Sequence, residues 1–224
     1  MRELDVQGIG MTSQRTRDRL VDKLEQLGIK DQNVLRVMRL VPRHLFMDEA
    51  LASRSYENTS LPIGHGQTIS QPYIVARMTE LLLEGEDELD NVLEVGTGSA
   101  YQAAVLGGLV KKLHTVERIL PLYRTARDLL YDLGYRNICA HHADGTWGWQ
   151  ESAPYDAIMV TAAPDEIPKS LIEQLKIGGR MIIPVGEENG AQILQRVIRK
   201  SKNEHVVENH ESVVFVPFLQ KETK

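Results

Sequence analysis

Cysteine is nearly absent from this chain: Cys139 is the one cysteine among 224 residues. A lone cysteine excludes a disulfide framework within the chain and a metal site built from several cysteines. The seven histidines are scattered. The adjacent pair His141-His142 would point to opposite faces of a strand, so we expect no metal centre. No apolar run approaches the roughly 20 residues of a membrane span, and the start lacks a signal-peptide pattern, so we expect a cytoplasmic protein without membrane contact.

An excess of positive charge is also missing. Lysine and arginine number 26 against 31 acidic residues, which gives a net charge of −5. Proteins that bind the phosphate backbone usually carry a basic face, so we expect no nucleic-acid partner. The hydrophobic share of 42% is ordinary for a globular protein, and the length is ample for one large domain.

Hydrophobic periodicity divides the chain into two parts. Helical spacing covers residues 12–27, 33–40 and 72–83, and a long polar segment lies between the second and third. Beyond residue 85, strands and helices alternate. Strands are expected at 92–95, 113–116, 138–140, 157–160 and 181–185, and helices at 101–109, 120–133 and 168–175.

Alternation of this kind predicts an α/β fold with a mostly parallel, doubly wound sheet. Residues 193–198 and 213–218 are expected to form an antiparallel C-terminal hairpin. We divide the chain into an N-terminal helical extension with the long loop, residues 1–72, and a Rossmann-like core, residues 73–224. The two are expected to form one compact unit.

A glycine loop, Gly96-Thr97-Gly98-Ser99, follows the first core strand and precedes a helix. Its glycines allow a sharp turn and close approach of the backbone to a ligand. A dinucleotide site would require a third glycine where Tyr101 stands. Glu94, two residues before the loop, would repel a pyrophosphate but suits the ammonium group of a methionine moiety. The loop and Glu94 are therefore predicted to bind a charged nucleoside.

Two further acids lie where the next two strands end. Glu117 follows Gly96 by 21 positions, a spacing that suits the ribose hydroxyls of a nucleoside. Arg118 is included in the same predicted site. Asp144 is expected to reach the adenine amino group, with Gly145 leaving room for the ring. The alternative is that these acids cap helices or face solvent.

Four segments resemble the protein-L-isoaspartate(D-aspartate) O-methyltransferase family, over about residues 34–218. The most specific is L-P-I-G-H-G-Q-T-I-S-Q-P at 61–72, and the others are L-E-V-G-T-G-S at 93–99, D-A-I-M-V-T-A-A-P at 156–164 and I-P-V-G at 183–186. The resemblance implies a Rossmann-like methyltransferase domain that uses S-adenosylmethionine and releases S-adenosylhomocysteine.

The implied substrates are peptides and proteins that contain isoaspartyl residues, with D-aspartyl residues as further candidates. The resemblance makes Ser70 the catalytic residue, and Gln67, Thr68 and Ile69 are expected to bind the substrate. Ser70 could instead cap the helix that begins at Pro72. We expect a monomer.

The implied acceptor is a carboxyl group with a pKa of about 3.5, already ionised at pH 7, so no general base is required. One position departs from the family pattern: Ala100 stands where the family usually has glycine. We expect this alanine to open the next helix with an ordinary negative φ, in which case it is harmless.

Three alternatives remain open at this stage. The first is a methyltransferase with another acceptor, such as a nucleic-acid base, although the segment after residue 160 lacks the acid or amide followed by two prolines typical of amine-directed base methylation. The second is a module that binds S-adenosylmethionine without catalysis. The third is an NAD oxidoreductase, which the missing third glycine disfavours.

Overall fold

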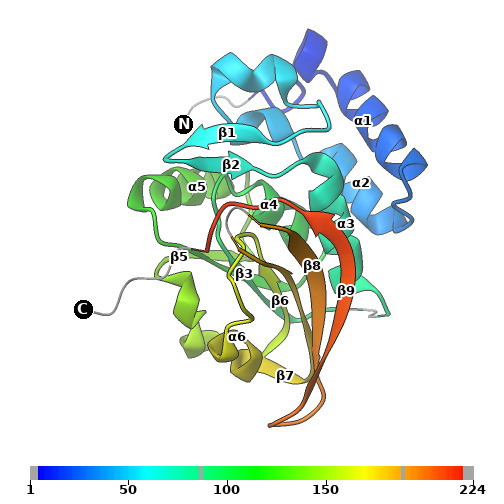
Figure 1. Cartoon of the computed structure of the whole chain (residues 1–224). Helices are drawn as coiled ribbons and strands as arrows, with labels where there is room; N and C mark the ends of the chain where they lie inside the picture. The colour runs from blue at the N-terminus through cyan, green and yellow to red at the C-terminus, as the bar shows by residue number, and fades with distance from the viewer. Residues whose placement is uncertain (1–4, 86–87, 188–189, 219–224) are drawn as a thin grey trace.

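The computed structural model describes residues 5–85, 88–187 and 190–218. Its centre is a seven-stranded sheet in the order β5-β4-β3-β6-β7-β8-β9 (Figure 1). The strands of this sheet are β3 (Asn91–Val95), β4 (Lys112–Glu117), β5 (Ile138–His142), β6 (Tyr155–Val160), β7 (Leu175–Val185), β8 (Gln192–Arg199) and β9 (His205–Val213). The α-helices are α1 (Gln14–Gln26), α2 (Gln32–Leu40), α3 (Pro72–Leu83), α4 (Tyr101–Gly107), α5 (Leu120–Asp132) and α6 (Lys169–Gln174).

The predicted α/β fold is confirmed. Strands β3 to β7 pair in parallel, whereas β8 pairs antiparallel with both β7 and β9. Right-handed crossovers through helices are the usual way to connect parallel neighbours, and α4 and α5 make two of these connections. No helix in the described part of the chain combines the length and apolarity that a membrane crossing demands.

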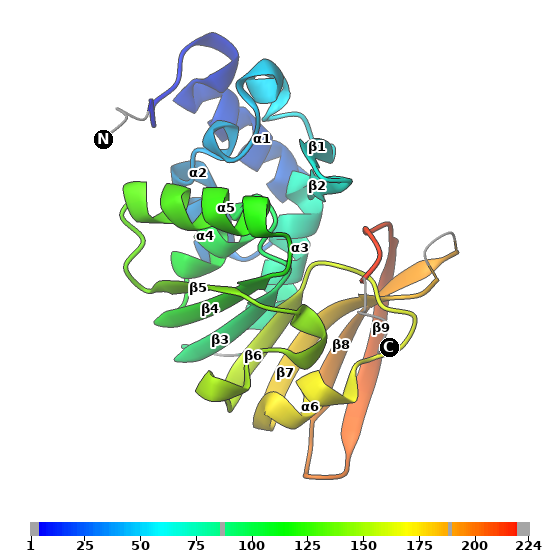
Figure 2. The same ribbon diagram turned by 90° about the vertical axis from the view of Figure 1, so that its left-hand side faces the viewer.

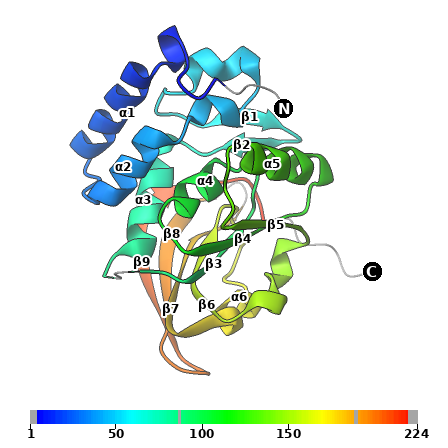
Figure 3. The same ribbon diagram turned by 180° about the vertical axis from the view of Figure 1, so that it is seen from behind.

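The helices cover the two faces of the sheet unequally. Side chains of α1 to α5 pack in one apolar cluster with Val92 of β3, and the next residue, Leu93, packs with Leu171 of α6 on the opposite face. This alternation follows from the period of two along a strand. Figure 2 shows α6 below the sheet, beside short helical turns, with α4 and α5 above it. Figure 3 shows α1 and α2 as an outer layer, and α2 contacts both α3 and α4.

The segment between α2 and α3 is more ordered than the predicted loop. It contains a small antiparallel hairpin of β1 (Leu61–Gly64) and β2 (Gln67–Ile69). Its two turn residues, His65 and Gly66, have φ of 54° and 71°. Two consecutive residues with positive φ match the turn that the twist of a two-residue hairpin favours. The hairpin delivers Ser70 directly to the start of α3.

The prediction of a last strand at residues 213–218 is wrong. The last strand is β9, and the chain beyond it crosses the edge of the sheet as an extended segment, residues 214–218, which we call the strap. The strap binds the loop after β6, because Ala163 N donates to Val216 O at 2.9 Å and Phe218 N donates to Ala163 O at 2.8 Å. β9 was missed because it is an edge strand with exposed side chains on both faces and no continuous apolar run.

The N-terminal helices share one continuous hydrophobic core with the sheet. Leu24 of α1 and Leu35 of α2 are fully buried in the same cluster as Val92 of β3. Burying one such side chain contributes about 1.5–3 kcal/mol. The predicted boundary between an N-terminal part, residues 1–72, and a core, residues 73–224, therefore stays a prediction.

Candidate active site

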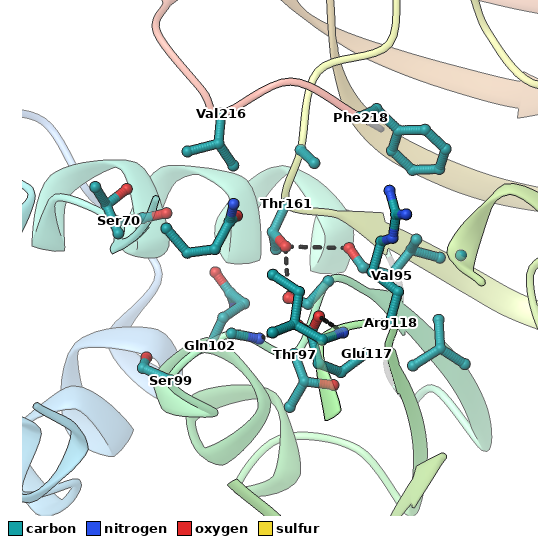
Figure 4. A pocket seen from close by; sticks show the side chains of 18 of the residues that line it. Ser70, Val95, Thr97, Ser99, Gln102, Glu117, Arg118, Thr161, Val216 and Phe218 are labelled. Atoms are coloured by element: carbon teal, nitrogen blue, oxygen red, sulfur yellow. Dashed lines mark hydrogen bonds between the residues drawn. The ribbon is translucent and has the colours of Figure 1, made fainter. Parts of the chain in front are cut away.

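A cavity lies at the carboxyl edge of the sheet, where β3, β4 and β6 end (Figure 4). Ligands of open α/β sheets bind at this edge. Six stretches of chain line the cavity together with Val75, Tyr101 and Gln102: residues 67–70, 95–99, 116–119, 144–146, 161–162 and 216–218. The hairpin, the glycine loop and the strap thus meet around one space.

The glycine loop is shaped as its sequence predicts. Gly96 has a φ of +97°, and a Cβ there would lie 2.4 Å from Thr161 Oγ1. That hydroxyl donates to Gly96 O at 2.6 Å and to Val95 O at 3.0 Å, which ties the loop to the end of β6. Glycine is therefore required at Gly96 by both its backbone conformation and its contacts. Thr97, Gly98 and Ser99 also line the cavity.

The expectation for Ala100 is wrong. The residue has φ 69° and ψ 7°, in the left-handed region, and it is fully buried at the N-terminal boundary of α4. Its N–H donates to Thr97 O at 2.8 Å, which closes a tight turn before the helix begins. An L-residue in this conformation brings its Cβ close to the following carbonyl oxygen, at a cost of roughly 1–2 kcal/mol. The loop therefore carries strain that glycine would avoid.

Glu117 ends β4 on the wall of the cavity and is 6% exposed. Its Oε2 accepts from Gly98 N at 2.9 Å and its Oε1 accepts from Ile119 N at 2.8 Å. Each carboxylate oxygen has a second lone pair, so both remain able to accept from a ligand. The side chain joins the glycine loop to the start of α5. Arg118 also lines the cavity, at the end away from Ser70 (Figure 4).

Asp144 and Gly145 line the same cavity. Asp144 Oδ1 accepts from Thr146 N at 3.0 Å and so caps the 3-10 helix Gly145–Trp147, as the alternative reading required. Its second oxygen is not used in that cap. A Cβ on Gly145 would lie 2.5 Å from Val95 Cγ1, so glycine keeps this wall close to β3.

Glu94 lies elsewhere than predicted. It is fully buried behind the glycine loop and is not part of the cavity wall. Thr115 Oγ1 donates to its Oε2 at 2.5 Å and shares a 2.6 Å hydrogen bond with Thr97 Oγ1. Burial raises the pKa of Glu94 to about 8, so the side chain is mainly a neutral acid at pH 7. Thr97 is the member of this chain of hydrogen bonds that reaches the cavity.

The hairpin brings Ser70 to the cavity with Gln67, Thr68 and Ile69. The helix-cap alternative for Ser70 is wrong, because the N-cap of α3 is Gln71 and the N–H of Tyr73 in the first turn donates to Asn58 Oδ1 at 3.0 Å. Among the described residues, none forms a hydrogen bond with the Ser70 hydroxyl. Ser70 also lines a second, adjoining cavity between α3 and the strap, which shares Thr68, Thr161 and Val216 with the first.

Sequence reasoning missed the walls that come from distant parts of the chain. Thr161 follows β6 at the carboxyl edge, so the rule that placed Glu117 could have found it. Gln102, which donates to Thr79 Oγ1 at 2.9 Å, faces the cavity from the first turn of α4. The sequence of the strap gave no indication that it lines the site, since its position depends on the path of β8 and β9. Within the described ranges, no group of three or more histidine, cysteine, aspartate or glutamate side chains could hold a metal ion.

Comparisons with known proteins agree with this geometry. Residues 15–223 match the family model described as protein-L-isoaspartate(D-aspartate) O-methyltransferase. The chain is 57% identical over 214 residues to the protein-L-isoaspartate O-methyltransferase 1 of Marinobacter nauticus, covering 96% of each chain. It is 56% identical to the enzyme of that name from Halorhodospira halophila, covering 98% of this chain and 99% of the relative.

Two solved structures are similar along most of the chain. One, a protein-L-isoaspartate O-methyltransferase, has a TM-score of 0.81 at 29% identity and aligns with 90% of this chain and 65% of its own. The other is such an enzyme from Plasmodium falciparum in complex with S-adenosyl-L-homocysteine, with a TM-score of 0.75 at 25% identity, covering 91% of this chain and 98% of that one.

Proposed function

The chain belongs to the protein-L-isoaspartate(D-aspartate) O-methyltransferase family, and on that premise we propose the reaction it performs. It transfers a methyl group from S-adenosylmethionine to the free α-carboxylate of L-isoaspartyl residues in damaged proteins. S-adenosylhomocysteine is the other product. The amide nitrogen of the following residue then attacks the methyl ester, methanol leaves, and the succinimide that forms begins repair. The observation that carries the proposal is that the glycine loop and Ser70, whose hydroxyl has no hydrogen-bond partner among the described residues, line one cavity.

The cavity fits this cofactor on two grounds. Gly96 and Gly145 keep its walls where any side chain would collide with Thr161 or Val95. Glu117 and Asp144 present carboxylates along the strand ends, where they can accept from ribose hydroxyls and the adenine amino group. We assign Gly96-Thr97-Gly98-Ser99 and Arg118 to the remainder of the cofactor. When bound, S-adenosylmethionine supplies a sulfonium-activated methyl group.

Ser70 is assigned to the acceptor. Its hydroxyl can donate to a carboxylate oxygen and hold it in the cavity, while Gln67, Thr68 and Ile69 form the adjoining wall. The second cavity leads away from Ser70 between α3 and residues 212–216, and it gives room for the peptide on either side of the modified residue. One serine thus stands at the junction of a cofactor cavity and a peptide cavity.

The chemistry needs positioning more than proton transfer. One C–S bond breaks and one C–O bond forms, and the positive sulfonium and the negative carboxylate neutralise each other. The acceptor is ionised at pH 7, so no residue has to remove a proton. Holding two reactants in line is worth roughly 7–11 kcal/mol of activation free energy. The chain therefore acts mainly by orienting the carboxylate and excluding water.

The cellular context is part of the same proposal. The partners are peptides and proteins with isoaspartyl residues, without nucleic acid or membrane, and the protein acts in the cytoplasm as a monomer. The net charge of −5 supports the proposal that nucleic acid is not a partner, because such a charge gives no general attraction to phosphate backbones.

The decisive experiment is transfer of labelled methyl groups to an isoaspartyl peptide beside its normal aspartyl twin. We expect label in the isoaspartyl peptide and none in its aspartyl twin. A D-aspartyl peptide measured in parallel shows whether D-aspartyl residues are also accepted. Equal labelling of the twins, or no labelling of either, would overturn the proposed substrate.

A further inference from the structure

Arg43 is a fully buried arginine in contact with the residue that follows the hairpin, Ser70, and with the first residue of α4, Tyr101. It begins the 3-10 helix Arg43–Phe46, after Val41-Pro42 has ended α2. Its Nη2 donates to the carbonyl oxygen of Ser70 at 2.9 Å, and its Nε donates to Ser55 O at 2.8 Å. The guanidinium carbon lies 4.7 Å from the ring centre of Tyr101. One side chain thus touches the proposed acceptor residue and a residue of the cofactor cavity.

The charge of Arg43 lacks a counter-ion among the described residues. No ion pair within the described part of the chain involves it. Its Nη1 is buried and has no hydrogen-bond partner in the part of the chain that the structure describes. Burial lowers the pKa of Arg43 to about 10, so the group keeps its charge at pH 7. A buried guanidinium nitrogen that lacks a partner is costly, and its position beside Ser70 calls for a compensating role.

A second buried arginine shows what a purely structural one looks like here. Arg17 of α1 is 2% exposed and donates to the backbone carbonyls of Val6, Arg39 and Leu40 and to the Tyr56 hydroxyl. These bonds use all three of its nitrogens. It touches no residue of either cavity.

We propose that Arg43 is a specificity-determining and positioning residue, which holds the Ser70 backbone in place and supplies the positive charge that draws the acceptor carboxylate to the Ser70 hydroxyl. This inference rests on the proposed function. A carboxylate bound at Ser70 would be the missing counter-ion of Arg43. The same charge discriminates against neutral acceptors, because a carboxamide or a peptide bond at that point gains nothing from it.

The size of the effect follows from Coulomb's law. For a carboxylate bound about 8 Å from the guanidinium, a unit charge at an effective dielectric constant near 20 would change binding by roughly thirtyfold. The expected selectivity can be isolated with two peptides, one carrying isoaspartate and one carrying isoasparagine, whose neutral α-carboxamide has nearly the same shape. Calorimetric titration into enzyme saturated with S-adenosylhomocysteine measures both affinities without turnover.

The variants to compare are Arg43→Met, Arg43→Lys and the control Arg17→Met. We expect Arg43→Met to reduce the preference for the charged peptide by roughly ten- to thirtyfold. Arg43→Lys keeps the charge and should retain the preference within about threefold. Its turnover should fall, because lysine lacks the planar guanidinium that donates to both Ser70 O and Ser55 O. Arg17→Met should lower thermal stability and leave the preference unchanged. If Arg43→Met does not fold, Arg43→Gln replaces it as the neutral variant.

Equal weakening of both peptides in Arg43→Met would show that Arg43 only supports the hairpin, and would overturn the inference. An unchanged preference would overturn it as well. These outcomes differ from a failure of the proposed function, in which the wild-type enzyme itself would not methylate the isoaspartyl peptide.

Discussion

Replacing Ala100 by glycine tests the strain in the cofactor loop. The substitution removes a Cβ held at φ 69° and so relieves about 1–2 kcal/mol. Against this, glycine adds about 0.4–1 kcal/mol of chain entropy to the unfolded state. It also gives up the burial of one methyl group, worth about 0.8 kcal/mol. The net change in the free energy of unfolding is therefore expected near zero, within about 1 kcal/mol.

Ala103 offers a matched control. It is also fully buried, and it lies one turn further along in α4 with a negative φ. Ala103→Gly loses about 1 kcal/mol of helix propensity and about 0.8 kcal/mol of methyl burial, with no strain to relieve. For a chain of this length, a loss of 1 kcal/mol lowers Tm by roughly 2–4 °C. We therefore expect Tm to fall by roughly 4–8 °C in Ala103→Gly and to stay within about 3 °C in Ala100→Gly.

Thermal unfolding followed by circular dichroism measures both values, and calorimetric titration with S-adenosylmethionine checks the loop. Ala100→Gly should bind the cofactor at least as tightly as the wild type, because glycine adopts the required φ without a penalty. Equal losses of Tm in the two variants would refute the reasoning, since they would show that Ala100 is not strained.

Three further predictions concern the site. Ser70→Ala should lower turnover in the methylation assay and leave the dissociation constant of S-adenosylmethionine nearly unchanged; normal turnover would remove Ser70 from the acceptor site. Glu117→Ala should weaken cofactor binding by about 1.5–3 kcal/mol, since a charged acceptor and its bonds to Gly98 and Ile119 are lost; an unchanged dissociation constant would contradict its assignment to the ribose. Glu94→Gln concerns pH: the raised pKa of Glu94 means that the folded state holds a proton which the unfolded state releases. The contribution of Glu94 to stability is therefore complete below about pH 4.5 and is lost as pH rises to about 8. The advantage of the glutamine variant in urea unfolding should grow from pH 5 to pH 8, and a constant difference would mean that Glu94 ionises normally.

The sequence predicted those helices, strands and loops whose position is determined by local residue patterns. Helix α3 was expected at residues 72–83 and occupies Pro72–Leu83, because proline in the first turn and a helical apolar period agree. The buried strand β3 was also expected within one residue. The glycine loop and Glu117 were placed at the correct edge by the rule for open sheets.

The failures have a common cause in tertiary context. β9 has mixed polarity because an edge strand needs little burial, and the apolar strap that follows it looked more like a strand. Ala100 takes a left-handed conformation because the turn from β3 into α4 imposes it, whereas alanine alone favours negative φ. Glu94 is predicted from the sequence to contact the ammonium group of the cofactor, yet it is fully buried, and hydrogen bonds link it through Thr115 of β4 to Thr97 of the loop.

The strap also sets when the site can exist. Ser70 and Phe218 lie about 150 residues apart along the chain, yet both line the cofactor cavity. At ~5–20 residues per second, a ribosome makes Phe218 roughly 7–30 s after Ser70. For most of that interval the growing chain carries Ser70 and the glycine loop but not residues 216–218 of the cavity wall. Any contact that the strap makes with the cofactor is therefore the last part of the site to become available.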